Sequence, residues 1–296
     1  MTGVLNLSDS RTCLTAAKAQ HDELMSVFAG WTDSGGLGLR CIRHPEFALY
    51  RWDVVVTAEP PKNLAHMVGE VINNLRSALE YVAFQIYLVA GGEPDGKVAE
   101  RVAFPILNTD GSWDSVVKKK VPGVWPEAAE LLKAAQPFSQ SGQDSDALPT
   151  LRGLGGTHKH RNLVLCATAA YSASAVWPSF VGVGLDIWVD RAPGDDTTKG
   201  PVIAIQPGTS VQVARVFAYP EGVPFDDAVM RWASGIDFKE PPPPDVDFSF
   251  RANNGAEVSL SAVVDLIDAV DGIVESFADL PGPDTVSPPP QSASTG

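Results

Sequence analysis

The longest helical pattern in the chain lies at residues 63–90, which read NLAHMVGEVINNLRSALEYVAFQIYLVA. Its apolar residues recur every three or four positions, the spacing of a helix with a packed face. They are Leu64, Met67, Val68, Val71, Ile72, Leu75, Leu79, Val82, Ala83 and Ile86. A second stripe is polar and consists of His66, Glu70, Asn73, Asn74, Ser77, Glu80 and Tyr81. We expect so apolar a helix to be central, and enclosed polar groups need partners, so this stripe is where we look for a site.

The rest of the chain alternates between helical and strand patterns. Helical spacing predicts further helices at residues 9–29, 113–120, 126–135, 147–170, 226–234 and 261–280. Strand patterns predict extended segments at 37–42, 47–57, 101–107, 180–189 and 202–219, and a hairpin of 246–252 with 256–260 around Asn253-Asn254-Gly255. We therefore expect an α+β fold, in which a helical core packs against antiparallel strands and a C-terminal helix closes the structure.

Four regions follow from this order. They are an N-terminal helix and hairpin (1–62), a helical core (63–170), a β-rich region with the C-terminal helix (171–280) and a disordered Pro/Ser tail (281–296). Because strands flank the helical core in sequence, one interleaved domain and two separate domains both remain open.

Composition limits the classes of function. The net charge of −14 disfavours bulk binding of nucleic acid, since affinity for nucleic acid comes from neutralising phosphates. The three cysteines are widely spaced, which argues against a disulfide framework or a cysteine-rich zinc site and favours the cytoplasm. No signal peptide is recognised, and no apolar run approaches the roughly 20 residues that span a bilayer. We expect a cytoplasmic protein that does not enter the membrane.

The central helix offers the first candidate site. His66, Glu70 and Asn74 are spaced four apart and lie on one helical face, while Arg76 and Glu80 are spaced to form an ion pair. One interpretation is a line of catalytic or ligand-binding groups. The other is a buried hydrogen-bond network that fixes packing against the 147–170 segment.

The second candidate is a basic cluster beside a glycine turn. It consists of His158, Lys159, His160 and Arg161, directly after Gly155-Gly156-Thr157. If a helix restarts at Thr157, the helix dipole disfavours these cations, and a bound anion would remove that conflict. The alternative is a continuous helix whose basic residues pair with acidic residues of the central helix. The spacing of a nucleotide-hydrolase phosphate loop is absent.

A zinc site is a third hypothesis. His66 and Glu70 together with His158 or His160 would supply nitrogen and oxygen ligands. No H-E-x-x-H pattern is present, so we assign no metal ligand and no cofactor.

Several short motifs in one order resemble a family of uncharacterised bacterial proteins common in actinobacteria and their phages. The motifs are NLRSALE (74–80), FPI (104–106) followed by Trp113, Lys120-Val-Pro-Gly, Gln136-Pro137-Phe138, the leucines 148, 151 and 154, and Lys159-His160-Arg161. The resemblance covers roughly residues 50–170. The family has no assigned activity.

Members of that family often carry NLRSALDH, which is similar to the R-x(4–6)-H motif of the HEPN superfamily of helical ribonucleases and nucleotide-binding modules. There, Arg and His act on an RNA phosphate. In this chain Arg76 matches, whereas Tyr81 stands at the histidine position and His158 stands where an acidic residue is frequent. HEPN-like catalysis here would need His158 or His160 as a replacement. The resemblance also allows a homodimer in which helix 63–90 buries apolar surface.

Three functional hypotheses follow. The first is a non-enzymatic binding protein for a phosphate-bearing small anion or a protein partner, with a ligand-binding set of His66, Glu70, Asn74, Glu80, Tyr81, His158, Lys159 and Arg161. The second is a metal-independent HEPN-like ribonuclease of phage defence or toxin biology, with Arg76 and His160 as catalytic residues. The third is a zinc-dependent hydrolase.

Overall fold

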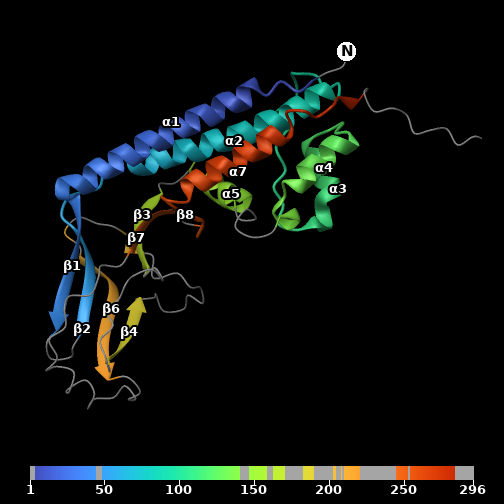
Figure 1. The fold of residues 1–296 in the computed structure, drawn as a ribbon. Helices are drawn as coiled ribbons and strands as arrows, with labels where there is room; N and C mark the ends of the chain where they lie inside the picture. Colours follow the sequence, from blue (N-terminus) through green and yellow to red (C-terminus); the bar gives the residue numbers. More distant parts are fainter. Residues whose placement is uncertain are drawn as a thin grey trace, which may run out of the picture.

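The fold is α+β, as the sequence predicts (Figure 1). The computed structural model describes residues 4–44, 49–140, 147–158, 163–170, 183–189, 203–204, 208, 210–220, 245–252 and 254–283. The predicted helix at 226–234 and the tail from residue 284 lie outside these ranges.

Three long helices lie side by side and form the body of the molecule (Figure 1). They are α1 (Ser8–Trp31), α2 (Leu64–Val89) and α7 (Val263–Ser276). All three were predicted, and α2 is central because it contacts α1, α5 and α7. Its apolar face is closed to solvent, with Val68, Leu75 and Ile86 all at 0% exposure.

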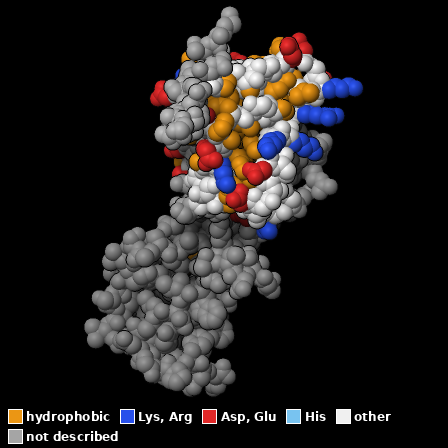
Figure 2. Space-filling view, turned by 90° about the vertical axis from the view of Figure 1, so that its right-hand side faces the viewer, with side chains coloured by type: hydrophobic (Ala, Val, Ile, Leu, Met, Phe, Trp, Pro, Cys, Tyr) orange, Lys and Arg blue, Asp and Glu red, His pale blue; other side chains and the backbone are white. Residues whose placement is uncertain are grey.

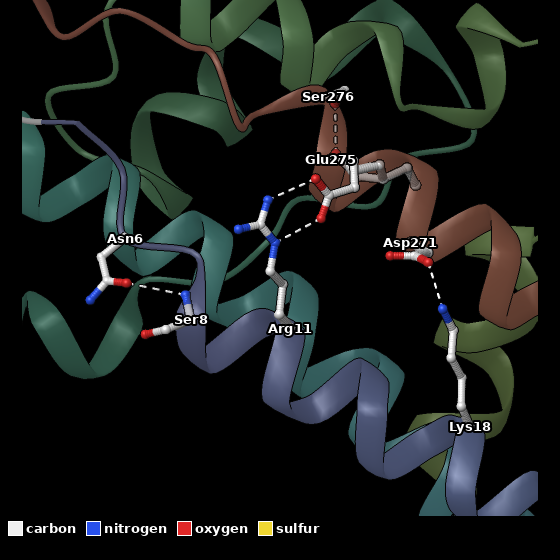
Figure 3. Close-up of polar contacts among 8 residues, drawn as sticks. Asn6, Ser8, Arg11, Lys18, Asp271, Glu275 and Ser276 are labelled. Carbon is white, nitrogen blue, oxygen red and sulfur yellow. Dashed lines mark hydrogen bonds and ion pairs between the residues drawn. The ribbon is translucent and has the colours of Figure 1, made fainter.

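Helix α1 runs antiparallel to both of its neighbours. On α2, the amide of Asn74 donates to Gln20 Oε1 (2.8 Å), and Gln85 Oε1 accepts from the backbone N–H of Asn6 (3.3 Å). Two ion pairs hold α1 against α7 (Figure 3). Arg11 binds both oxygens of Glu275 (2.8 and 2.7 Å), and Lys18 binds Asp271 at 2.7 Å.

Shorter helices lie below and beyond this layer. They are α3 (Trp113–Lys120), α4 (Pro126–Ala134) and α5 (Ala147–His158), together with single 3₁₀ turns at Ala99–Arg101, Asp110–Ser112 and Pro137–Ser139. At the end of the molecule that carries α3 and α4, hydrophobic side chains gather beside Lys and Arg side chains (Figure 2). Lysines 118–120 form the last turn of α3, where the helix dipole favours cations.

The described strands form two antiparallel sheets. The first has the order β1-β2-β6-β4, and the second has the order β5-β3-β7-β8. The strands of the first sheet are β1 (Leu37–His44), β2 (Leu49–Val56), β6 (Ser210–Pro220) and β4 (Val183–Val189). Those of the second are β5 (Ile203–Ala204), β3 (Val164–Ala170), β7 (Asp245–Arg251) and β8 (Glu257–Ser259).

One predicted helix was wrong in its second half. We expected a helix over 147–170, but α5 ends at His158 and residues 164–170 form β3. This strand pairs along its whole length with β7, from Val164 opposite Arg251 to Ala170 opposite Asp245. A run of seven apolar or small residues is compatible with a buried helix and with a buried strand, so the local pattern does not distinguish the two. The hydrogen bonds to β7 determine that this segment is a strand.

The predicted β-hairpin is confirmed. Strands β7 and β8 are antiparallel, with Phe250 opposite Val258, and Gly255 adopts a φ of +85° in the turn. That left-handed conformation costs glycine little. One hydrophobic cluster includes residues of this hairpin, of α1, α2, α5 and α7, and of the segments around α3 and α4. The helices and the β7–β8 hairpin therefore share a core, to which the first sheet contributes Val56 of β2.

Candidate functional site

The candidate site is built around an irregular segment, residues 104–107, which we call the strap. Its sequence is Phe104-Pro105-Ile106-Leu107. Phe104 and Ile106 are buried in the core, at 1% and 8% exposure. Three side chains from elsewhere in the chain bind the strap backbone, namely those of Glu80, Gln136 and Arg152. The strap thus receives from side chains the hydrogen bonds that a neighbouring strand usually supplies.

Gln136 binds one edge of the strap. Its Oε1 accepts from the N–H of Leu107 (2.9 Å), and its Nε2 donates to the carbonyl of Pro105 (3.0 Å). The same Nε2 donates to the carbonyl of Leu132 in α4 (2.8 Å). Gln136 is fully buried, so these bonds satisfy the amide where solvent is absent.

Glu80 and Arg152 bind the other edge. Glu80 Oε2 accepts from the N–H of Phe104 (2.6 Å), and Arg152 Nη1 donates to the carbonyl of Ile106 (3.2 Å). Polar groups of residues 104 and 106 are bound from one side, and those of 105 and 107 from the other. This alternation is the pattern of an extended backbone, in agreement with the predicted extended segment.

Arg76 completes the cluster from α2. Its Nη2 lies 2.7 Å from Glu80 Oε1, which confirms the predicted pairing one helical turn apart. Glu80 therefore accepts from a guanidinium group with one oxygen and from the strap with the other. The Arg76 side chain is 28% exposed, yet its Nη1 is buried and has no hydrogen-bond partner in the described part of the chain.

An unpartnered guanidinium nitrogen is unusual. Arginine presents five N–H donors, and buried polar groups are nearly always paired. The free energy lost by leaving a buried donor without an acceptor is about 1–3 kcal/mol, and more for charged groups. Arg76 Nη1 is therefore an unsatisfied donor. Because this nitrogen is closed to solvent, an acceptor reaches it only when the partly exposed Arg76 side chain moves.

The other predicted polar residues of α2 lie elsewhere on the helix. His66 is exposed, Tyr81 is 40% exposed, and Glu70 is half-buried. Asn74 binds Gln20 of α1, so its hydrogen bond links α2 to α1 and not to α5 as the packing interpretation supposed. The structure thus brings Arg76 and Glu80 together and leaves His66 and Tyr81 on the outer face of α2.

The basic cluster follows α5 directly. His158 is the last residue of α5, while Lys159, His160 and Arg161 lie outside the described residues, as does the His158 side chain. The end of α5 is near α2, because a Cβ built on Gly155 would lie 4.0 Å from Cγ2 of Ile72. Ile72 is one helical turn before Arg76 on α2.

Sequence reasoning missed Arg152 and Gln136 as partners of the strap. Gln136 was noted only as part of a resemblance, and Arg152 was not singled out. Both bonds join residues far apart in sequence, by 29 positions for Gln136 to Leu107 and by 46 for Arg152 to Ile106. No local spacing rule could have predicted these contacts.

Within the described residues, no group of three His, Cys, Asp or Glu side chains is placed to hold a metal ion. The zinc hypothesis also invoked His158 and His160, whose side chains are not described, so it stays a prediction. None of the described helices is long and apolar enough to cross a membrane. Comparison with protein-family models, curated proteins and solved structures finds no match to this chain.

Proposed function

We propose that this chain is a cytoplasmic, non-enzymatic binding protein for a small phosphate-bearing anion. The ligand would bind beside Arg76, between α2 and the segment that follows α5. The single observation that carries the proposal is the buried, unpartnered Nη1 of Arg76. A phosphate oxygen is a suitable acceptor, since arginine binds phosphate through paired N–H donors.

The surroundings support an anion rather than a cation. Arg76 and Arg152 contribute two positive charges to the cluster, and Glu80 contributes one negative charge. In sequence, Lys159 and Arg161 follow α5 closely. Lys159 and Arg161 lie outside the described residues, and the proposal adds their charges to those of Arg76 and Arg152 in a chain whose net charge is −14. A small anion needs only a local basic site of this kind, whereas bulk binding of nucleic acid needs an extended basic surface.

Calorimetric titration with inorganic phosphate tests the proposal. We expect saturable binding that Arg76→Gln weakens by about tenfold or more, the value of one charge-assisted hydrogen bond. Arg11→Gln is the matched control, because Arg11 is an exposed arginine paired with Glu275 on α1 and α7. Absence of phosphate binding by the folded wild-type protein, or equal loss in both variants, would refute the proposal.

A HEPN-like ribonuclease is the second proposal, because the same Arg76 donor would hold a scissile phosphate. It predicts RNA cleavage that survives a chelator and is lost in Arg76→Ala and in His160→Ala. Cleavage abolished by the chelator would instead favour the zinc hydrolase. No cleavage of varied RNAs by the wild-type protein would leave the binding protein as the better account.

A protein partner would be the alternative ligand of a binding protein. The end of the molecule that carries α3 and α4 displays hydrophobic side chains beside basic ones (Figure 2). If this end binds an acidic partner, phosphate would not compete, so the titrations above separate the two ligands.

A further inference from the structure

Asn254 and Gly255 lie between β7 and β8 and are the only Asn-Gly pair in the sequence. In such a pair, the backbone nitrogen of the glycine can lose its proton, attack Cγ of the asparagine side chain and expel ammonia. The cyclic succinimide that results takes up water and opens to aspartate or isoaspartate, so the chain gains a carboxylate. Glycine has no Cβ to hinder the attack, and Asn254 is exposed to the water that the second step consumes.

Hydrogen bonds in the folded chain oppose this reaction. Asn254 Nδ2, the nitrogen that would leave as ammonia, donates to the carbonyl of Gly153 in α5 (2.9 Å). Asn254 Oδ1 accepts from the backbone N–H of Ala256 (3.0 Å), and the N–H of Gly255 donates to the carbonyl of Ala252 (3.0 Å). Ring closure removes the proton of Gly255 and turns the side chain of Asn254 onto that nitrogen, so these bonds must open first.

The bond to α5 is the long-range one, since Gly153 and Asn254 are 101 positions apart. Here α5 lies very close to the hairpin: a Cβ built on Gly153 would be 2.6 Å from Cβ of Ala256. We infer that Asn254 is a deamidation site that α5 keeps closed, and that it reacts when the hairpin separates from α5. The aspartate formed has no N–H to donate to Gly153, so the modified chain does not recover this contact. This inference does not depend on the proposed ligand.

The rate of deamidation at mildly alkaline pH tests the inference. Peptide mapping by mass spectrometry measures it, and fragment ions distinguish Asn254 from Asn253. We expect the folded wild-type chain to react about tenfold or more slowly than the chain unfolded in guanidinium chloride, because the reactive state is reached only by local opening. Folded Gly153→Ala should react about fivefold faster than wild type, since its methyl group displaces the hairpin and breaks the bond to Asn254.

Gly155→Ala is the matched control. It makes the same change in the same helix, but its Cβ would meet only Cγ2 of Ile72 at 4.0 Å, an ordinary contact. Gly153→Ala combined with Ala256→Gly removes the overlapping methyl group and should restore the slow rate. Circular dichroism checks that each variant is folded.

Equal rates in the folded and unfolded wild-type chain would overturn the inference. It also fails if folded Gly153→Ala reacts as slowly as wild type, or if Gly155→Ala accelerates the reaction as much, since the bond to Gly153 would then not be what protects Asn254. The wild-type comparison needs no variant, so it decides the inference even if Gly153→Ala does not fold.

Discussion

At the scale of single residues, Gln136 is a buried polar side chain that connects the strap to α4. It is fully buried and makes three hydrogen bonds to backbone groups of the strap and α4. Gln136→Met would keep the size of the side chain but leave these groups without partners. We expect a loss of roughly 3 kcal/mol in the free energy of unfolding, measured with urea.

The control for this prediction is Gln140→Met. Gln140 is exposed and makes one side-chain hydrogen bond, to the carbonyl of Ala134 (3.1 Å). Water can replace that bond, so the variant should be close to wild type. Equal effects of the two substitutions would mean that the strap does not depend on Gln136.

Cys166 gives a second prediction at this scale. Burial in β3 raises the pKa of its thiol to about 11 from 9.0. At pH 8 the thiolate fraction is then roughly a hundredfold lower than for an unperturbed cysteine, and the side chain is only 3% exposed. We expect Cys166 to react with a thiol reagent only after unfolding, with Cys166→Ser identifying its signal. Rapid labelling of Cys166 in the native protein would contradict this.

At the scale of elements, two surface ion pairs link α1 to α7, which also pack through the hydrophobic core. The hydrogen bond from Arg11, followed by its charge, lowers the pKa of Glu275. The stabilisation is therefore present above the unfolded pKa of this carboxyl and is lost as pH falls through the lowered value. We expect Glu275→Gln to be slightly less stable than wild type at neutral pH, and the difference to vanish in strong acid.

Arg11 and Glu275 are both exposed, so their ion pair contributes little to the free energy of unfolding, and this contribution is sensitive to salt. Glu23→Gln is the control, because Glu23 is an exposed acid of α1. Thermal unfolding across pH measures both. A difference for Glu275→Gln that grows as pH falls would mean that another group causes the pH dependence.

At the scale of the whole molecule, the hairpin of β7 and β8 shares a core with the long helices. Phe250 of β7 is completely buried in the cluster that contains α1 and α2. Phe250→Ala should lower the free energy of unfolding by roughly 3–5 kcal/mol, the usual result of truncating a buried aromatic ring. Because the core is shared, helical and tryptophan signals should shift together in chemical denaturation.

Val264→Ala is the control for this substitution. Val264 lies on α7 and is 41% exposed, so its truncation removes little buried surface. Equal effects of Phe250→Ala and Val264→Ala on the free energy of unfolding would mean that Phe250 does not contribute to the shared core.

The sequence by itself determined the α+β class, the three long helices and the hairpin. Each depends on local spacing: the apolar period of residues 64–86, the amphipathic pattern after residue 261, and the Asn-Gly turn at 254–255. The pairing of Arg76 with Glu80 is also local, since one helical turn separates them.

Only the tertiary structure decided the rest. Residues 164–170 became β3 because β7, about 80 positions later, provides its hydrogen-bond partner. The strap, Gln136 and Arg152 meet because α2, α4 and α5 pack around one extended segment. The unpartnered nitrogen of Arg76 is also decided by the tertiary structure. Every segment that surrounds a donor determines whether it is buried and whether an acceptor lies within reach.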